Sequence, residues 1–326
     1  MYITRRTQYV EIDGVPSDQI EISSGVPQGT VLGPALFSIY INDLFTIPFN
    51  TNIVGFADDA KIFGTPGAAL QADIDSVSKW AKTNEMTLNS GKCHVIHLGR
   101  SNPHIVYYID DNQLFVETEI RDLGIIVDET LSFRPHCLYI KKKCYRLINL
   151  MFRAFHTRDT HFYLRLYTTY ITPIAEYSGF LYALNSTANT NTLEKINKYF
   201  SKRLWCRVNM TQNAPTYNIR LSKFGLMSLE RRFLTQDLIL LFKVLRGVVS
   251  SSGFAVRFST LRSHRIVLDA VKTSRFRNYF LHRTQLLWNK TIHDTSYLTM
   301  SLKQYRKFVD SIDFSAVFHG SALKAH

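Results

Sequence analysis

Two adjacent aspartates, Asp58 and Asp59, lie inside an apolar run that reads VGFADDAKIFG. Burying neighbouring carboxylates costs several kcal/mol each unless they are paired or bind a cation. The flanking residues, Ile53–Ala57 and Ala60–Phe63, predict a β-hairpin with the pair at its turn. One interpretation is a harmless exposed turn, but the Gly or Asn typical of a two-residue hairpin turn is absent. The other interpretation is a metal site, because divalent cations prefer oxygen ligands.

The aspartate pair alone does not make a two-ion site. Enzymes that transfer phosphoryl groups hold two divalent ions about 3.5–4 Å apart, which stabilise the attacking and leaving oxygens. Neighbouring residues of a strand point to opposite faces of a sheet. A third carboxylate from an adjacent strand is therefore needed.

The first part of the chain predicts an α+β arrangement. A helix is expected from Gly33 to Phe45, opened by Pro34, because proline is tolerated in a first turn. An amphipathic helix is expected over Ala68–Met86 from its apolar spacing. Short strands are expected at Gln8–Ile12, Gln19–Ile22, Val95–Leu98, Ile105–Ile109, Gln113–Thr118 and Leu123–Val127.

After about residue 133 the pattern becomes helical, with apolar stripes and basic faces. The expected helices are Ile140–Phe155, His161–Tyr170, Leu193–Trp205 and Leu229–Arg246. Residues 261–288 mix basic and aromatic residues without a clean period. Ser250–Gly253 predicts a linker.

The charge of the chain is divided between these two parts. Residues 1–130 carry 8 Lys and Arg against 17 Asp and Glu, a net charge of −9. Residues 131–326 carry 31 against 9, a net charge of +22. A basic region of this strength indicates a polyanionic partner, with a generic basic surface as the alternative.

The four cysteines, Cys93, Cys137, Cys144 and Cys206, show no zinc-type spacing. Reduced thiols fit a nuclear or cytoplasmic protein that is not secreted. The sequence shows no signal peptide and no apolar run long enough to span a bilayer, so no membrane partner is expected.

Several longer stretches carry a family resemblance. They read SGVPQGTVLGPALFSIYIND from Ser24, WAKTNEMTLNSGKCHVIHLGR from Trp80 and DLGIIVDETLSFRPH from Asp122. Together with FADD, they resemble the palm of a reverse transcriptase of the non-LTR retrotransposon kind. LYTTYITPIAEYSGFLY, FGLMSLERRFLTQDLILLFKVLRG and RTQLLWNKT resemble its thumb, connection and C-terminal signature. The resemblance thus covers nearly the whole chain.

The resemblance implies a fold and a division into domains. Residues 1–130 are expected to form a partial palm, an α+β unit with an antiparallel sheet and packed helices. Residues 131–326 are expected to form a mostly helical thumb and connection region. The implied partners are an RNA template and a DNA primer or RNA–DNA hybrid, with dNTP if the protein is active.

The resemblance also implies roles for individual residues. Asp58 and Asp59 would be catalytic metal ligands for Mg²⁺ or Mn²⁺, and Lys92 would assist the pyrophosphate leaving group. A solvated cation after a Ser-Gly turn is the alternative for Lys92. The residues expected to contact template and nucleotide are Gly25, Pro27, Gln28 and Gly29, and those at the primer grip are Leu123 and Gly124.

The physical properties of these residue types agree with those roles. Glycine lets a backbone approach a ligand closely, and glutamine offers both a donor and an acceptor without charge. A plain strand-to-helix turn is the alternative for this loop. The basic region is expected to contact the nucleic-acid backbone through Lys141, Lys142, Lys143, Arg146, Arg231 and Arg232. Tyr145, Trp205, Phe276 and Trp288 could stack on bases or belong to the core.

The family places another catalytic aspartate in a pattern FxDxxKAFD before SGVPQG, and residues 1–23 contain nothing like it. The sequence therefore predicts an N-terminally truncated domain that does not polymerise DNA by itself. Two alternatives remain: a retained RNA- or DNA-binding module, and a subunit that needs a complementing chain.

Overall fold

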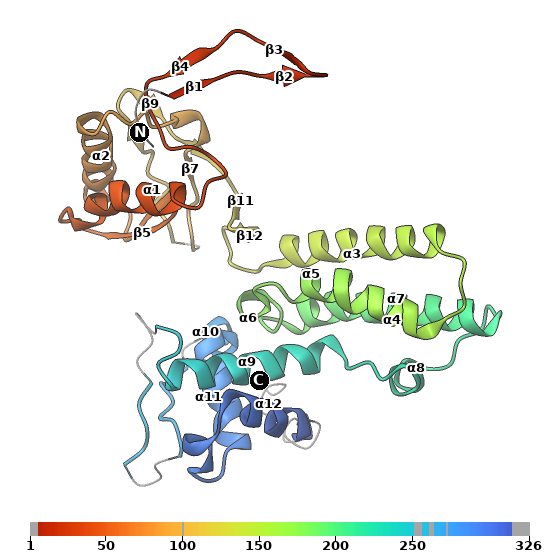
Figure 1. The fold of residues 1–326 in the computed structure, drawn as a ribbon. Helices are drawn as coiled ribbons and strands as arrows, with labels where there is room; N and C mark the ends of the chain where they lie inside the picture. Colours follow the sequence, from red (N-terminus) through yellow and green to blue (C-terminus); the bar gives the residue numbers. More distant parts are fainter. Residues whose placement is uncertain (1–5, 100, 251–255, 261–263, 272, 315–326) are drawn as a thin grey trace. The chain divides into compact units, whose positions relative to one another are not determined.

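The computed structural model describes residues 6–99, 101–250, 256–260, 264–271 and 273–314. The chain divides into two compact units, residues 1–118 and residues 119–326. Unit 1 combines short strands with helices, and unit 2 is mostly helical (Figure 1). In the part of the chain that is described, no helix is both long enough and apolar enough to cross a membrane.

Unit 1 begins with a long hairpin. Strand β1 (Arg6–Gln8) pairs antiparallel with β4 (Ile20–Ile22), and β2 (Glu11–Ile12) pairs antiparallel with β3 (Val15–Pro16). Asp13 and Gly14 form the turn, with φ of 51° and 80°. An Asp-Gly pair with two positive φ angles suits a tight hairpin turn. The predicted pair of strands joined by a turn is confirmed.

The next segment places a helix before the hairpin that carries the aspartates. Helix α1 (Gly33–Ile41) has a proline in its first turn and continues as the 3₁₀ helix η1 (Asn42–Thr46). Strands β5 (Asn52–Phe56) and β6 (Asp59–Phe63) pair antiparallel, so the predicted hairpin is confirmed.

The rest of unit 1 packs against helix α2 (Ala68–Thr83). Tyr107, Ile109 and Leu114 form a small core with Leu70 and Ile74 of α2. The remaining elements are η2 (Ser90–Lys92), β7 (His94–Val95), β8 (Tyr108–Ile109), β9 (Asn112–Gln113) and β10 (Phe115–Val116). Strands β8 and β9 pair antiparallel, whereas β7 and β10 pair in parallel.

Unit 2 begins with the hairpin of β11 (Glu119–Asp122) and β12 (Ile125–Asp128). This hairpin packs on the helical part: Ile125 is buried in its core, and the backbone N–H of Ile126 donates to Nδ1 of His136 at 3.2 Å. These contacts join the β11–β12 hairpin to the helices of unit 2, while the predicted division into a palm and a thumb stays a prediction.

The helices of unit 2 follow the hairpin. They are α3 (Arg134–Ala154), α4 (Thr160–Leu166), the π-helical η3 (Tyr167–Ile171), α5 (Thr172–Glu176), α6 (Gly179–Tyr182), α7 (Thr187–Asn209), α8 (Tyr217–Phe224), α9 (Leu229–Leu245), α10 (Ser274–Asn278), α11 (Phe280–Thr291), η4 (Ser296–Thr299) and α12 (Leu302–Ser311).

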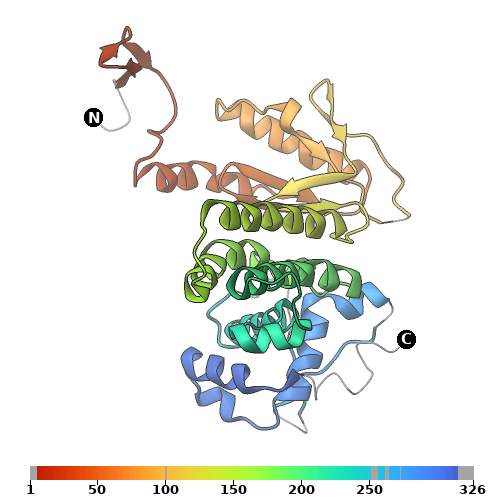
Figure 2. The ribbon, with the colours of Figure 1, turned by 90° about the vertical axis from the view of Figure 1, so that its right-hand side faces the viewer.

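These helices stack in layers (Figure 2). Helix α3 packs along α7, α7 contacts α9, and α9 contacts both α11 and α12. One buried cluster joins α3, α7 and the segment from α4 to α6, and it includes the fully buried Phe200 and Leu193. A second cluster joins α9, α11 and α12 around Trp288 and Tyr305.

The architecture agrees with the sequence in class but not in every detail. The α+β character of the first part and the helical character of the second are both present. The sequence predicted an antiparallel sheet, whereas the described strands form two-stranded pairs, five antiparallel and one parallel. The predicted linker at Ser250–Gly253 lies almost wholly outside the described residues.

Candidate active site and nucleic-acid interface

The aspartate pair lies at the tip of the β5–β6 hairpin. Phe56 pairs with Asp59, so Ala57 and Asp58 form the two-residue turn. Ala57 has φ of 53°, a left-handed conformation that costs energy for a residue with a Cβ. Both carboxylates are exposed, and within the described part of the chain neither has a hydrogen bond or ion pair.

The hairpin is held in place from two sides. At the start of β5, Asp73 of α2 accepts four hydrogen bonds of 2.6–2.9 Å from the backbone and side chains of Asn50 and Thr51. Burial alone would raise the pKa of Asp73, but these bonds hold it below its usual value. Gly55 lies against the ring of Phe45, with which a Cβ at that position would clash. The tip is therefore exposed while its base is fixed.

The carboxylates present do not fit a two-ion metal site. Among the residues that the structure describes, no group of three His, Cys, Asp or Glu side chains could hold a metal ion. Asp58 and Asp59 are neighbours in the sequence, one in the turn and one at the start of a strand. They could supply ligands to an ion, but two-ion phosphoryl transfer requires carboxylates from more than one segment.

The loop predicted to contact template and nucleotide is open and shaped by its glycines. Gly25 and Gly29 have φ of 80° and 75°, in the region that favours glycine. The guanidinium of Arg6 donates to the carbonyl of Gly25 at 2.5 Å. Gln28 is exposed and has no hydrogen-bond partner among the described residues. Its amide is thus available to a ligand.

The same loop is joined to helix α1 through Thr30. The hydroxyl of Thr30 donates to the carbonyl of Pro27 at 2.8 Å and accepts from the N–H of Gly33 at 3.2 Å. A Cβ on Gly33 would approach the Pro27 carbonyl oxygen to 2.9 Å. Gly33 therefore allows the loop to pack closely on the helix.

Lys92 is exposed at the end of η2. No hydrogen bond or ion pair in the described part of the chain joins Lys92, or the loop at Gly25–Gly29, to the aspartate pair. The role predicted for Lys92 stays a prediction.

The residues predicted to form the primer grip make a tight turn in unit 2. Asp122 pairs with Ile125, so Leu123 and Gly124 make a two-residue turn with φ of 43° and 86°. Positive φ angles at both central residues are typical of a type I′ turn, whose twist matches the right-handed twist of the two flanking strands. The hydroxyl of Tyr177 donates to the carbonyl of Leu123 at 3.0 Å. This turn is therefore well anchored, and Leu123 itself is 41% exposed.

The predicted backbone-contact residues fall into two groups. Lys142, Lys143 and Arg146 are exposed on α3, while Lys141 is half-buried with its ammonium 5.6 Å from the ring centre of Tyr145. Consecutive residues of a helix spread around its axis, so the side chains of the run Lys141–Lys143 do not share one face.

The second group, on α9, is engaged within the protein. The guanidinium of Arg231 donates to the backbone carbonyl of Asp310 at 2.8 Å, and that of Arg232 pairs with the carboxylate of Glu176. Their guanidinium groups thus already have protein partners, and a contact with phosphate remains a prediction.

Most of the aromatic residues considered for stacking belong to the core. Trp288 is fully buried, and its indole N–H donates to the carbonyl of His264. Tyr145 and Trp205 are half-buried; Tyr145 stacks on Tyr199, and Trp205 packs against the first cluster. Phe276 is 40% exposed.

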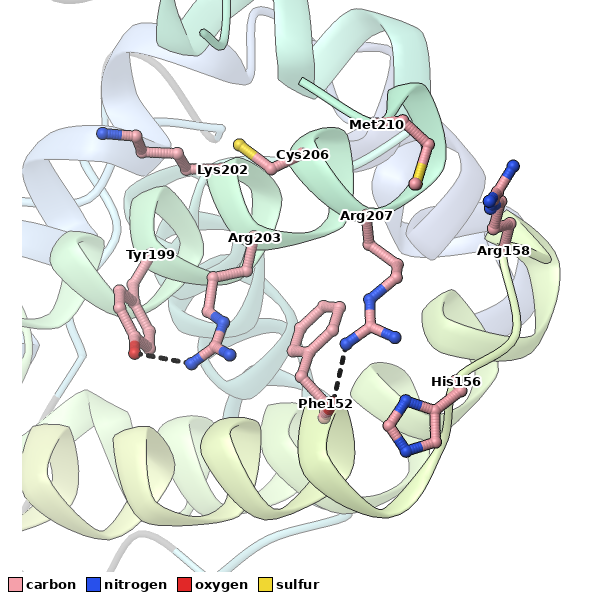
Figure 3. Close-up of a pocket in the computed structure, with 9 residues that line it drawn as sticks. All are labelled: Phe152, His156, Arg158, Tyr199, Lys202, Arg203, Cys206, Arg207 and Met210. Atoms are coloured by element: carbon pink, nitrogen blue, oxygen red, sulfur yellow. Dashed lines mark hydrogen bonds between the residues drawn. The ribbon is translucent and has the colours of Figure 1, made fainter. Parts of the chain in front are cut away.

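A basic hollow between α3 and α7 was not predicted from the sequence (Figure 3). It has a volume of about 740 Å³, and its basic lining side chains include Arg158, Lys202, Arg203 and Arg207. A smaller hollow of about 380 Å³ adjoins it through Arg203 and adds Arg146 and Arg153. We call the two together the α3–α7 hollow. The i, i+4 spacing of Tyr199, Arg203 and Arg207 on one helix was the available signal.

Comparison with known proteins finds similarity in the first part of the chain. Residues 2–143 match the family described as reverse transcriptase (RNA-dependent DNA polymerase). The chain is 28% identical over 155 residues to the RNA-directed DNA polymerase from mobile element jockey of Drosophila melanogaster, covering 43% of this chain and 17% of that protein.

Two further relatives have similar names. The jockey polymerase of Drosophila funebris is 31% identical over 146 residues, covering 39% of this chain and 15% of that protein. The probable RNA-directed DNA polymerase from transposon X-element of Drosophila melanogaster is 26% identical over 154 residues, covering 44% and 17%. The chain thus spans less than a fifth of the length of each relative. No solved structure matches it.

Proposed function

We propose that residues 2–143 form a reverse transcriptase-like domain of the kind found in non-LTR retrotransposon polymerases, and that the chain binds a template–primer duplex without polymerising DNA by itself. Reverse transcriptases use a divalent metal ion, and polymerases of this family act on a nucleic-acid template and primer with dNTP substrates. The proposed nucleic acid is an RNA template with a DNA primer or an RNA–DNA hybrid.

The composition of the candidate metal site carries the proposal of inactivity. Asp58 and Asp59 are the carboxylates at the hairpin tip, and no group of three metal ligands exists among the described residues. Electrostatic stabilisation of the transferring phosphoryl group is usually the largest single contribution to catalysis. With the ions incompletely held, we expect the rate to fall by many orders of magnitude. If another carboxylate completed the site, Mg²⁺ or Mn²⁺ would bind there.

The charge of unit 2 supports the proposal of nucleic-acid binding. Residues 119–326 carry 32 Lys and Arg against 13 Asp and Glu, a net charge of +19. Phosphate contacts by such residues supply most of the sequence-independent affinity for nucleic acid. In this proposal, Gly25, Pro27, Gln28 and Gly29 contact template and nucleotide, and Leu123 and Gly124 contact the primer. The expected location is nuclear or cytoplasmic.

A primer-extension assay tests the absence of polymerase activity. The purified chain is incubated with an RNA template, an annealed DNA primer, dNTP and either Mg²⁺ or Mn²⁺. We expect no extension above background, and the same result for Asp58→Asn. Robust extension by the natural chain that disappears in Asp58→Asn would contradict the proposal, because it would demonstrate a polymerase site that depends on Asp58.

Binding is tested separately by fluorescence anisotropy with the same template–primer duplex. We expect the affinity to fall steeply as salt increases, by about 10³-fold or more between 50 and 200 mM if six or more phosphates are contacted. An affinity that stays flat over this range contradicts the proposed binding while leaving the question of catalysis untouched.

Exposed apolar residues of unit 1 favour a second candidate, a subunit completed by another chain. Val31 is 94% exposed, Ile39 74%, Phe56 62% and Phe63 52%. Large exposed apolar side chains near a candidate site often mark an interaction surface. Purification of the chain with its bound partners, followed by the primer-extension assay, tests this candidate. Activity in the complex but not in the isolated chain is the expected result.

A further inference from the structure

The α3–α7 hollow combines several positive charges with no opposing charge. Its basic side chains are Arg146, Arg153, Arg158, Lys202, Arg203 and Arg207, and no carboxylate lines either part. None of these six forms an ion pair with another residue of the described chain. Like charges gathered without counter-charges repel one another, so an anion in the hollow would relieve that repulsion.

Two of the arginines are held in position by the protein (Figure 3). Arg203 donates to the side-chain oxygen of Asn149 and, at 3.0 Å, to the hydroxyl of Tyr199. Arg207 donates to the backbone carbonyls of Phe152 and Phe155 at 2.8 and 3.4 Å. Fixed guanidinium groups lose little conformational entropy on binding an anion, and their planar donors match phosphate.

Helix stabilisation accounts for only one of the basic side chains considered next. Arg207 caps the last carbonyls of α3, and a cation there also suits the helix dipole. Arg153, Arg158 and Lys202 are exposed and make no hydrogen bond with the described residues. Helix stabilisation therefore explains Arg207 but not these three.

The basic surface is elongated along α3. Lys142, Arg146, Asn149 and Arg153 follow at i, i+4, i+7 and i+11, so they lie along one face of the helix. At 1.5 Å per residue this row is about 16 Å long. A duplex carries a phosphate about every 3.4 Å per strand along its axis. The surface can therefore meet several phosphates in succession, which a single small anion would not use.

From these observations we propose that the α3–α7 hollow binds consecutive phosphates of a nucleic-acid strand. The proposal rests on the proposed function of nucleic-acid binding and assigns it a site. Arg203 and Arg207 hold one phosphate, while Arg153, Arg158 and Lys202 surround its neighbours. The ring of Tyr199 stacks on that of Tyr145 with the ring centres 4.2 Å apart. The proposed contacts are to phosphates, so they carry no base-sequence specificity.

The test compares two triple variants of the full chain with equal loss of charge. R153Q/R158Q/K202Q removes three exposed cations from the hollow. K303Q/R306Q/K307Q removes three exposed cations from α12 and serves as the control. Binding of a fluorescent single-stranded RNA and of an RNA–DNA hybrid is measured by anisotropy over a range of salt concentrations.

We expect the hollow variant to lower the slope of log affinity against log salt by about 2–3, at about 0.7–0.9 for each phosphate contact. The α12 variant should change the slope much less. Equal slopes for the two variants would overturn the assigned site while leaving nucleic-acid binding intact. Failure of the natural chain to bind either probe would refute the proposed function itself, and the assigned site with it.

A second measurement needs no variant. Exposed lysines are acetylated with an amine-reactive reagent in the presence and absence of the RNA, and the modified sites are read by mass spectrometry. Protection of Lys202 with unchanged labelling of Lys303 and Lys307 supports the proposal. Unchanged labelling of Lys202 at saturating RNA contradicts it.

Discussion

The buried carboxylate of Asp73 positions the hairpin that carries Asp58 and Asp59. It is 1% exposed and accepts all four hydrogen bonds from Asn50 and Thr51 at the start of β5. Replacement by asparagine places an N–H₂ group, which cannot accept a hydrogen bond, opposite some of these donors. Because hydrogen bonds to a charged group contribute about 1.5–3 kcal/mol each and cannot all be kept, we expect Asp73→Asn to lower the free energy of unfolding by about 2–3 kcal/mol.

Urea denaturation measures this loss, with Asp75→Asn as the control because Asp75 is exposed on the same helix. The pKa of Asp73 is depressed in the folded state, so its contribution is present above the pKa of the unfolded chain and is lost as the pH falls through the folded value. The difference between the natural chain and Asp73→Asn should therefore shrink in acid. An equal loss in both variants at neutral pH would refute the assigned role.

His136 is a second buried polar residue, and its pKa is also lower in the folded chain than in the unfolded chain. Its Nδ1 accepts from the N–H of Ile126, so the proton is on Nε2, which has no protein partner in the described chain. Burial, with a smaller contribution from the charge of Arg121, lowers the pKa of His136 from 6.5 to about 4. The folded chain thus holds a neutral imidazole where the unfolded chain takes up a proton.

Stability should therefore fall as the pH drops from about 6.5 to about 4, because unfolding binds a proton in this window. We expect a loss on the order of 3 kcal/mol from this group, at 1.36 kcal/mol per pKa unit. His136→Asn keeps an acceptor near Nδ1 but does not titrate. Urea denaturation at several pH values should show the natural chain losing its advantage over His136→Asn in acid, and a constant difference would contradict the assignment.

At the scale of elements, the β11–β12 turn contains a residue that does not suit its backbone. Leu123 has φ of 43°, which costs a residue with a Cβ about 1–2 kcal/mol. Asn-Gly is the preferred pair for this turn. We expect Leu123→Asn to raise the free energy of unfolding by about 1 kcal/mol, since the Leu123 side chain is largely exposed and loses little packing.

Leu138→Asn is the control for this change, because Leu138 is 45% exposed but lies within α3. There asparagine should give no gain and a small loss through its lower helix propensity. Thermal unfolding of the two variants beside the natural chain measures the contrast. A loss of stability in Leu123→Asn would mean that the leucine side chain contributes packing that outweighs the backbone strain.

Periodicity in the sequence predicted the helices that became α2, α3, α7 and α9, because apolar stripes depend only on local spacing, but it predicted no helix over α11 or α12. It could not give the exact start of α3 at Arg134 or the turn at Leu123, where tertiary contacts with His136 and Tyr177 fix the backbone. The hairpin at Asp58 was predictable from its flanking apolar strands. For its strained turn at Ala57, the only indication in the sequence was the absence of the Gly or Asn that such a turn prefers.

The basic hollow depends on contacts between residues that lie far apart in the sequence. The run Lys141–Lys143 is conspicuous in the sequence, yet a helix turns its members to different sides. Asn149 and Arg203 meet in the fold although 54 positions separate them. Conversely, Arg232 is basic in the sequence but is paired with Glu176 in the fold. The charge composition was sufficient to predict a polyanionic partner. The position of the cations that remain available to it follows only from the packing of α3 on α7.

At the scale of the whole molecule, the two units differ in the size of their cores. Among the described residues, the buried apolar side chains of unit 1 are Ile41, Leu44, Ala81, Tyr107, Ile109 and Leu114. Unit 2 has two large clusters, which bury several aromatic rings including Tyr163, Phe200 and Trp288. Since burial of apolar surface is the dominant favourable contribution to folding, unit 2 should be the more stable.

We therefore expect the isolated chain to unfold in two steps, with unit 1 unfolding first. Hydrogen exchange measured by mass spectrometry at increasing urea should show the amides of α2 losing protection before those of α7 and α9, because local opening follows the number of buried apolar contacts. Far-UV circular dichroism of the same samples should retain most of its helical signal after the first step, since most helices belong to unit 2. A single transition in which α2, α7 and α9 lose protection together would show that the units fold as one. That outcome would also weaken the case for a completing partner, because the small core of unit 1 would then be sufficient without one.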